Sequence, residues 1–166
     1  FGQFNHEPDE LEDWSVEAWV RPTNPASGTP QTILERPVML PAGNELCGDT
    51  VVQLNFRIGL NPDGTPFTEY SNSACDPIFT RANAGPAYAL VANEWAHVAA
   101  TYDTVSNRLS LYVDGVLVQM TPSNNRPANG YILPYIYSAP IVLGASDINT
   151  NGSMSGSRWW ACVTEG

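Results

Sequence analysis

The sequence predicts an all-β fold, a sandwich of two antiparallel sheets, and three observations point to it. Its 166 residues contain several short runs of alternating apolar and polar residues, and a period of two indicates strands with one buried face. The 14 prolines and 13 glycines are spread between these runs, where such residues end strands and form turns. No stretch keeps a helical apolar period beyond two turns. The length suits a single domain, which we expect to span residues 1–166.

The first expected strand covers residues 14–21 and stops at Pro22. Its alternation places four apolar residues on one face: Trp14, Val16, Ala18 and Val20. A short strand over residues 31–36 follows and ends at Pro37, because proline lacks the backbone N–H that a sheet needs.

The next strands form a hairpin. The run over residues 51–60 sets five apolar residues on one face, namely Val52, Leu54, Phe56, Ile58 and Leu60. The Asn-Pro-Asp-Gly turn at residues 61–64 then returns the chain along residues 65–71.

This hairpin predicts a disulfide. Folding about the turn places Val51 opposite residue 74 or 75, and Cys47 lies four residues beyond Val51, at the open end. A bridge between Cys47 and Cys75 would clamp two long loops, as in many secreted domains. The alternative is two free, buried thiols. Either way Cys162 is left without a partner.

A three-stranded meander is expected over residues 95–102, 108–114 and 115–121. Asp114-Gly115 predicts a two-residue type I′ turn, because both positions need positive φ. Pairing around that turn puts apolar residues together on one face, as the pairs Val113–Val116, Leu111–Val118 and Leu109–Met120. The other face pairs Tyr112 with Leu117 and Ser110 with Gln119. The preceding strand adds Tyr102, Ala100 and Val98 to the apolar face, so the register is well specified.

Charge excludes two classes of partner. The net charge is −10, from seven arginines, no lysine and 17 acidic residues. Such a surface repels phosphate groups, so we expect no nucleic acid and no anionic membrane as partner. No apolar run reaches the length of a membrane span, so no membrane insertion is expected. An acidic surface also suits calcium-rich extracellular surroundings, although solubility alone is the simpler explanation.

Three ordered motifs carry a family resemblance. Residues 93–118, NEWAHVAATYDTVSNRLSLYVDGVLV, closely resemble the central signature of bacterial laminin-G-like, concanavalin-A-like jelly-roll domains. Residues 13–22, DWSVEAWVRP, resemble the early strand of that family, and residues 141–146, IVLGAS, resemble a late one. The resemblance implies a concanavalin A-like, two-sheet antiparallel jelly-roll β-sandwich. Two family strands look absent: the first is reduced to FGQF, and GSRWWACVTEG replaces the closing one, so we expect the domain to lack both.

The resemblance also implies a function. The family mostly occurs as adhesion or carbohydrate-recognition modules of larger secreted proteins, which implies an extracellular or cell-surface module that binds glycans or surface proteins. The alternative is a structural subunit that self-associates through open edge strands into an extracellular fibre, sheath or coat. The missing strands and the unpaired Cys162 favour that alternative.

We expect no enzyme. Endo-glucanases of the same fold align their acids in a Glu-x-Asp-x-x-Glu run, whereas the nearest stretch here, residues 10–17, has the wrong spacing. No Gly-x-Ser-x-Gly elbow is present. His97, cross-strand from Asp114, is expected to be a hydrogen-bonded structural residue.

One loop predicts a calcium site. Asp147, Asn149 and Asn151 precede Gly152 in an Asp-x-Asn-x-Asn-Gly pattern, which supplies oxygen ligands at alternate positions. Arg158 stands where such loops carry a bidentate acid, so a carboxylate from another loop would have to complete the shell. An ordinary Asn- and Gly-rich loop is the alternative.

Aromatic residues predict a ligand-binding rim. The chain has five tryptophans and seven tyrosines, more than one core needs, and exposed rings stack on sugars or anchor protein partners. The candidates are Tyr131, Tyr135, Tyr137, Trp159 and Trp160. The alternative for residues 131–137 is that they cover an open edge of the sandwich.

Overall fold

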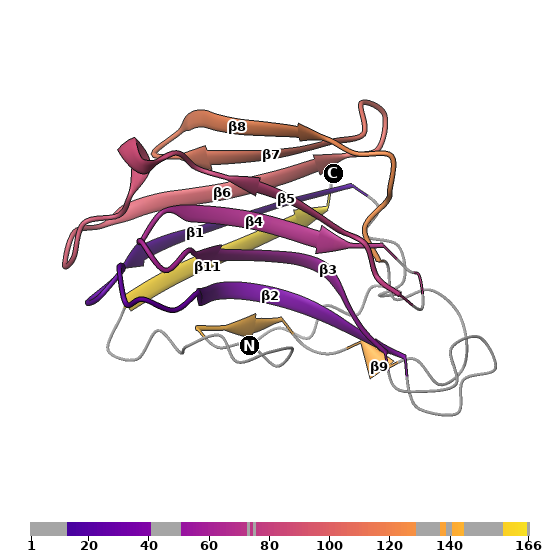
Figure 1. Ribbon diagram of the computed structural model, residues 1–166, viewed down its shortest axis with the longest axis horizontal. Coiled ribbons are helices and arrows are strands. Elements are labelled where there is room, and N and C mark those ends of the chain that lie inside the picture. Colours follow the sequence, from indigo (N-terminus) through magenta and orange to yellow (C-terminus); the bar gives the residue numbers. More distant parts are fainter. Residues whose placement is uncertain are drawn as a thin grey trace.

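The computed structural model is a sandwich of two antiparallel β-sheets, with sheet B in front of sheet A in Figure 1. It describes residues 13–40, 51–72, 74, 76–128, 137–138, 141–144 and 158–165. Sheet A has the order β11 (Arg158–Glu165), β1 (Trp14–Arg21), β6 (Ala96–Asp103), β7 (Arg108–Val113) and β8 (Val116–Pro122). Sheet B has the order β10 (Val142–Leu143), β2 (Gln31–Leu40), β3 (Val51–Leu60), β4 (Pro66–Ser71) and β5 (Phe79–Asn83), and β9 (Tyr137–Ser138) also pairs with β2. A short 3₁₀ helix, η1 (Pro86–Tyr88), precedes β6. The predicted all-β sandwich is confirmed.

The core lies between the two sheets, where the alternating strands bury their apolar faces. The predicted face of β1 is buried, and so is the predicted face of β3 as far as its side chains are described, from Leu54 to Leu60. Aromatic rings join the two layers: Trp14 of β1 lies 5.5 Å from Phe56 of β3, centroid to centroid. Burial of these faces removes apolar surface from water and is the main stabilising contribution.

The β3–β4 hairpin has the predicted register, with Leu60 opposite Pro66 and Arg57 opposite Glu69. Cys47 and Cys75 both lie outside the described residues. Their disulfide therefore remains a prediction from the sequence.

The β6–β8 meander matches the prediction except at one point. Asp114 and Gly115 have φ of 49° and 78°, as a type I′ turn requires. As predicted, Tyr102, Ala100 and Val98 of β6 join the apolar face, opposite Leu109, Leu111 and Val113 of β7. The first two pairs between β7 and β8 are also as predicted. Beyond them Val118 forms a β-bulge, so β8 shifts by one residue and Leu111 pairs with Gln119. The predicted pairs Leu111–Val118, Leu109–Met120 and Ser110–Gln119 are therefore wrong.

The expectation of a missing closing strand is also wrong. Residues 158–165 form β11, which pairs with β1 along its whole length. The reason is that RWWACVTE alternates like a strand although it lacks the family pattern: its register sets Trp159, Ala161 and Val163 opposite core-facing residues of β1. The expected absence of a first strand concerns residues 1–12, which lie outside the part of the chain that the structure describes.

One end of the sandwich is closed by the segment that follows β8. The hydroxyl groups of Tyr70 and Tyr102 both donate to the carbonyl oxygen of Asn125, at 2.7 and 3.3 Å. The two rings meet edge to face, with centroids 5.0 Å apart. Burial, together with the neighbouring Tyr70, raises the pKa of Tyr102 well above its usual range.

Candidate functional site

Four charged residues form a row across sheet B, one from each of four neighbouring strands. Pairing sets Glu35 of β2 opposite Arg57 of β3, Arg57 opposite Glu69 of β4, and Glu69 opposite Arg81 of β5. The next residue on β3, Ile58, belongs to the core, so the row lies on the outer face of the sheet. We call Glu35, Arg57, Glu69 and Arg81 the charged row.

Ion pairs connect the charged row from end to end. The Nε of Arg57 lies 2.8 Å from Oε2 of Glu35, and its Nη1 lies 2.8 Å from Oε1 of Glu69. The Nη1 of Arg81 lies 3.2 Å from Oε2 of Glu69. Glu69 therefore uses one oxygen for each arginine, and the alternation of charge fixes all four side chains relative to one another.

Most of the charged row is buried, which makes it unusual for the outer face of a sheet. The exposed fraction of the side chain is 0% for Glu35, 6% for Arg57 and 7% for Glu69, but 35% for Arg81. Taking such charges out of water costs several kcal/mol per ion, and their mutual attraction often only offsets that cost. The ion pairs of the charged row therefore contribute little to the stability of the fold. The row meets solvent at Arg81, the partly exposed residue at its end.

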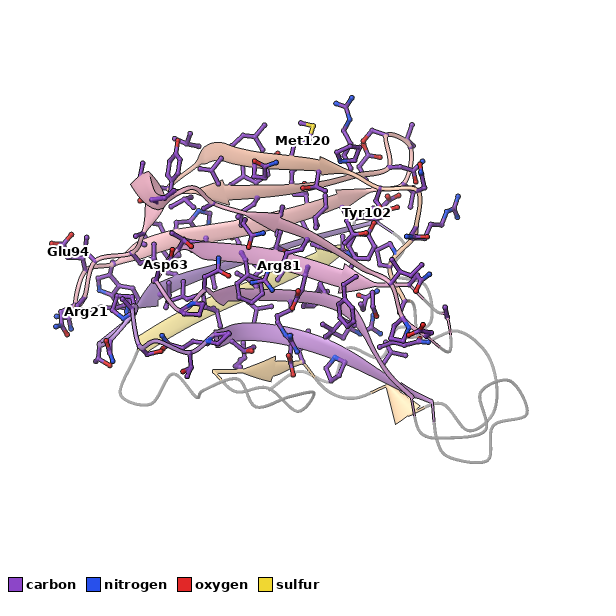
Figure 2. The ribbon with its side chains drawn as sticks, in the orientation of Figure 1. Arg21, Asp63, Arg81, Glu94, Tyr102 and Met120 are labelled. Carbon is purple, nitrogen blue, oxygen red and sulfur yellow. The ribbon has the colours of Figure 1, made fainter. Side chains whose placement is uncertain are left out.

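The guanidinium of Arg81 is held from three sides. Its Nη2 donates to Oδ1 of Asn61 at 2.6 Å, and its Nε donates to Oδ1 of Asn83 at 3.0 Å. Its central carbon lies 3.7 Å from the centroid of the Phe67 ring, a cation–π contact. Figure 2 shows Arg81 over the middle of sheet B, on the side that faces the viewer.

Glycine at position 59 makes room for the Phe67 ring below Arg81. Gly59 pairs directly with Phe67. A Cβ at Gly59 would lie 2.7 Å from that ring and 2.5 Å from the carbonyl oxygen of Gln31 on β2. The missing side chain therefore lets Phe67 lie against the sheet and support the guanidinium.

The β3–β4 turn completes the support. Asn61 donates to the hydroxyl of Thr65 at 3.0 Å, and Thr65 donates to Asp63 through its hydroxyl and its backbone N–H, at 2.7 and 3.0 Å. These hydrogen bonds to Thr65 hold the pKa of the Asp63 carboxyl below its usual range. The turn thus holds the amide of Asn61 that Arg81 contacts.

This arrangement can bind an anion. An arginine has five N–H donors in a planar fork that matches a carboxylate. The contacts described above use three of those of Arg81, which leaves two N–H groups without a partner among the described residues. The result is an oriented cation on a partly exposed side chain, beside the polar side chains of Asn61 and Asn83.

Of the residues that the sequence predicted as sites, only Tyr137, Trp159 and Trp160 belong to described strands. Tyr131, Tyr135 and the calcium candidates Asp147, Asn149 and Asn151 lie outside the described residues, so both predictions stay open. The backbone of Tyr137 belongs to β9 of sheet B, whereas Trp159 and Trp160 belong to β11 of sheet A. No metal-binding group of three acidic, histidine or cysteine side chains occurs within the described ranges.

His97 lies where the sequence predicted. Its backbone N–H donates to the Asp114 carboxylate at 2.8 Å, and its ring contacts the Glu17 carboxylate at 3.1 Å. The charged row, in contrast, was missed by the sequence analysis. One charged residue per strand at an outward position is ordinary for a sandwich, and only the sheet order shows that these four meet.

Comparison with solved structures gives the same fold. One match is the CBM40 of the Ruminococcus gnavus IT-sialidase bound to α2,3-sialyllactose, with a TM-score of 0.66 and 14% identity, covering 94% of this chain and 77% of that chain. Another is the botulinum neurotoxin serotype D ligand-binding domain in complex with N-acetylneuraminic acid, with a TM-score of 0.58 and 14% identity, covering 97% and 35%. A third is the leech intramolecular trans-sialidase complexed with 2,7-anhydro-Neu5Ac, with a TM-score of 0.58 and 14% identity, covering 82% and 18%.

The chain thus spans about a third or less of the toxin and leech chains, and at these identities the likeness shows the fold alone. No curated protein matches the sequence. The family model of the concanavalin A-like lectin/glucanases superfamily, of the laminin-G type, matches residues 2–165. That match spans nearly the whole chain, and the protein belongs to this superfamily.

Proposed function

We propose that the protein is a non-catalytic glycan-binding module whose site is the outer face of sheet B around Arg81. The observation that carries the proposal is the partly exposed side chain of Arg81, whose guanidinium is held in place by Glu69, Asn61 and Asn83 and backed by Phe67. Three proteins of similar fold are bound to sialyllactose, 2,7-anhydro-Neu5Ac or N-acetylneuraminic acid. These sugars carry a carboxylate, the group that an arginine fork recognises best.

Preorganisation supports binding at this position. A side chain that is already ordered loses little conformational entropy when the ligand arrives, so more of the contact energy appears as affinity. Arg81 meets this condition because hydrogen bonds restrain three of its nitrogens. The neighbouring amides of Asn61 and Asn83 add polar groups of the kind that orient sugar hydroxyls.

The contacts of the charged row favour binding over hydrolysis. A retaining glycosidase needs two carboxyl groups about 5 Å apart that are available to the scissile bond. Both oxygens of Glu69 accept hydrogen bonds from arginines, and Glu35 is fully buried against Arg57. We therefore assign these acids to positioning the arginines, not to proton transfer.

We also propose an extracellular or cell-surface location, where glycans are displayed. The family membership supports it, since laminin-G-like and lectin domains commonly act outside cells. Within the described residues the structure has no helix long and apolar enough to span a membrane.

Calorimetric titration with 3′-sialyllactose, with lactose as the uncharged reference, tests the proposal. Arg81→Ala should weaken sialyllactose binding by about tenfold or more, because hydrogen bonds to charged groups contribute about 1.5–3 kcal/mol. Arg81→Lys should restore little, since lysine lacks the planar fork. Arg108→Ala, an exposed arginine on β7 of sheet A, is the matched control. Equal affinity of the native protein and Arg81→Ala for sialyllactose would refute the site.

Self-assembly is the second candidate function, and the edge of sheet A favours it. β8 is an edge strand of sheet A, and none of its seven residues carries a charge that would oppose pairing with another chain. Val116, Leu117 and Met120 of this strand are exposed. At the other side of sheet A, the strand β1 is covered by β11. Light scattering over a concentration series tests this candidate: Leu117→Lys should abolish any growth in particle size, and a monomer at every concentration excludes it.

A further inference from the structure

A second cluster of side chains lies on the other side of the sandwich, on the outer face of sheet A. Trp19 of β1 pairs with His97 of β6, and their ring centroids lie 5.1 Å apart. The Nε2 of His97 lies 3.1 Å from Oε2 of Glu17, two residues before Trp19 on the same face of β1. We call Trp19, His97 and Glu17 the Trp19 cluster.

Hydrogen bonds hold His97 at the centre of the cluster. The backbone N–H of His97 donates to Oδ1 of Asp114, and the backbone N–H of Asp114 donates to the carbonyl oxygen of His97, both at 2.8 Å. The histidine is therefore fixed by the turn on one side and by Trp19 and Glu17 on the others. A ligand that contacts this cluster would meet side chains that are already oriented.

Exposure of Trp19 has no explanation in the packing of the sandwich. The residue is 50% exposed, although β1 is an inner strand between β11 and β6. Its neighbours Ala18 and Val20 point to the core and are buried, so Trp19 adds nothing to the contact between the sheets. An exposed indole ring beside oriented polar groups offers a ligand both an apolar face for stacking and hydrogen-bond partners.

The chemistry of the cluster matches an uncharged sugar. The apolar face of a pyranose ring can stack on an indole, while its hydroxyl groups donate to a carboxylate. The Glu17 side chain is 53% exposed, and its second oxygen has no partner among the described residues. That carboxylate would repel an acidic sugar, in contrast to Arg81 on sheet B.

We infer that the outer face of sheet A carries a second glycan site, in which Trp19 stacks on a neutral pyranose and Glu17, oriented by His97, accepts hydrogen bonds from its hydroxyl groups. This site does not rest on the sheet B proposal, because the two faces lie on opposite sides of the core. A domain with both sites binds an acidic sugar on one face and a neutral sugar on the other, and so can link two glycans.

Saturation-transfer NMR with four neutral disaccharides tests the inference: lactose, cellobiose, mannobiose and chitobiose, each at about 10 mM, well above a millimolar Kd. At least one should receive saturation from the native protein, and Trp19→Ala should abolish the signal. Phe79→Ala is the matched control, since Phe79 is an aromatic residue with 48% exposure on β5 of sheet B, on the other side of the core. Arg81→Ala should leave the signal unchanged, which separates this site from the one on sheet B.

Glu17→Gln keeps the inference testable if Trp19→Ala fails to fold, which a thermal melt would reveal. The change removes only the charge of an exposed side chain, so the melting temperature should stay the same. Affinity for the neutral sugar should fall by about tenfold, because a hydrogen bond to a charged acceptor becomes a neutral one. The inference is overturned if no neutral disaccharide binds the native protein, or if Trp19→Ala and Phe79→Ala weaken binding equally.

Discussion

Replacing Gly59 by alanine should destabilise the protein and weaken the sheet B site together. The added Cβ would lie 2.5 Å from the carbonyl oxygen of Gln31 and 2.7 Å from two carbons of the Phe67 ring. The carbonyl belongs to the paired strand β2, so it cannot retreat without disturbing the sheet. The ring is held from the other side by the guanidinium of Arg81.

The expected size follows from these contacts. Inserting one carbon into a well-packed site typically costs about 1–3 kcal/mol, because neighbours must leave their preferred positions. Alanine also restricts the unfolded chain, which offsets up to about 1 kcal/mol of that cost. For a domain of this length, each kcal/mol that remains lowers the melting temperature by about 2–4 °C.

Gly85→Ala is the matched control. A Cβ at Gly85 meets no heavy atom within 4 Å. The residue has φ of −73°, which alanine adopts without strain. The same chemical change should therefore be neutral there, or stabilising by up to about 1 kcal/mol.

Urea unfolding of the native protein and both variants measures the difference, and titration with sialyllactose measures the effect on the site. In Gly59→Ala the displaced Phe67 should move the guanidinium of Arg81 and lower the affinity, whereas Gly85→Ala should bind as the native protein does. If the two variants are equally stable, the close approach at Gly59 does not constrain the fold and the reasoning fails.

Three further outcomes are expected. Leu111→Ala should destabilise the protein by about 2–5 kcal/mol in urea unfolding, because Leu111 is fully buried in the core. Gln119, which pairs with Leu111, is exposed, so Gln119→Ala should cost less than about 0.5 kcal/mol. Equal costs would contradict the core assignment. Because burial raises the pKa of Tyr102, the phenol loses its proton at a lower pH in the unfolded chain than in the folded one, so the free energy of unfolding falls as the pH rises above about 10. In urea unfolding from about pH 8 to 11, Tyr102→Phe should reduce that fall. Tyr88→Phe, which changes an exposed tyrosine, should not. If the predicted loop binds calcium, about 0.1–1 mM calcium should raise the melting temperature and magnesium should raise it less. Asp147→Ala should abolish this difference. A melting curve that calcium leaves unchanged would mean an ordinary loop.

Local patterns explain how much of the fold could be predicted. The alternation over β1 identifies its buried face, because successive side chains of a strand point to opposite sides whatever the strand pairs with. The type I′ turn at Asp114-Gly115 follows from the backbone angles that these two residues accept. Such features depend on a few neighbouring residues, and the described structure confirms both.

The bulge and the closing strand show where local patterns fail. At Val118 the apolar alternation favours an unbroken ladder, but packing at an edge strand shifts the register by one residue. Residues 158–165 lack the family's closing motif, yet they pair with β1 because their alternation complements it. In both cases the deciding partner is another strand.

The sequence by itself determined the class of fold, the buried faces of β1 and β3 and the family of the chain, since all of these follow from periodicity and motifs along the chain. Only the tertiary structure decided that Glu35, Arg57, Glu69 and Arg81 form one connected row, and that Trp19 and Glu17 meet His97. The physical reason is that strand order and register arise from packing both sheets at once. A site built from one residue per strand therefore leaves no continuous motif in the sequence.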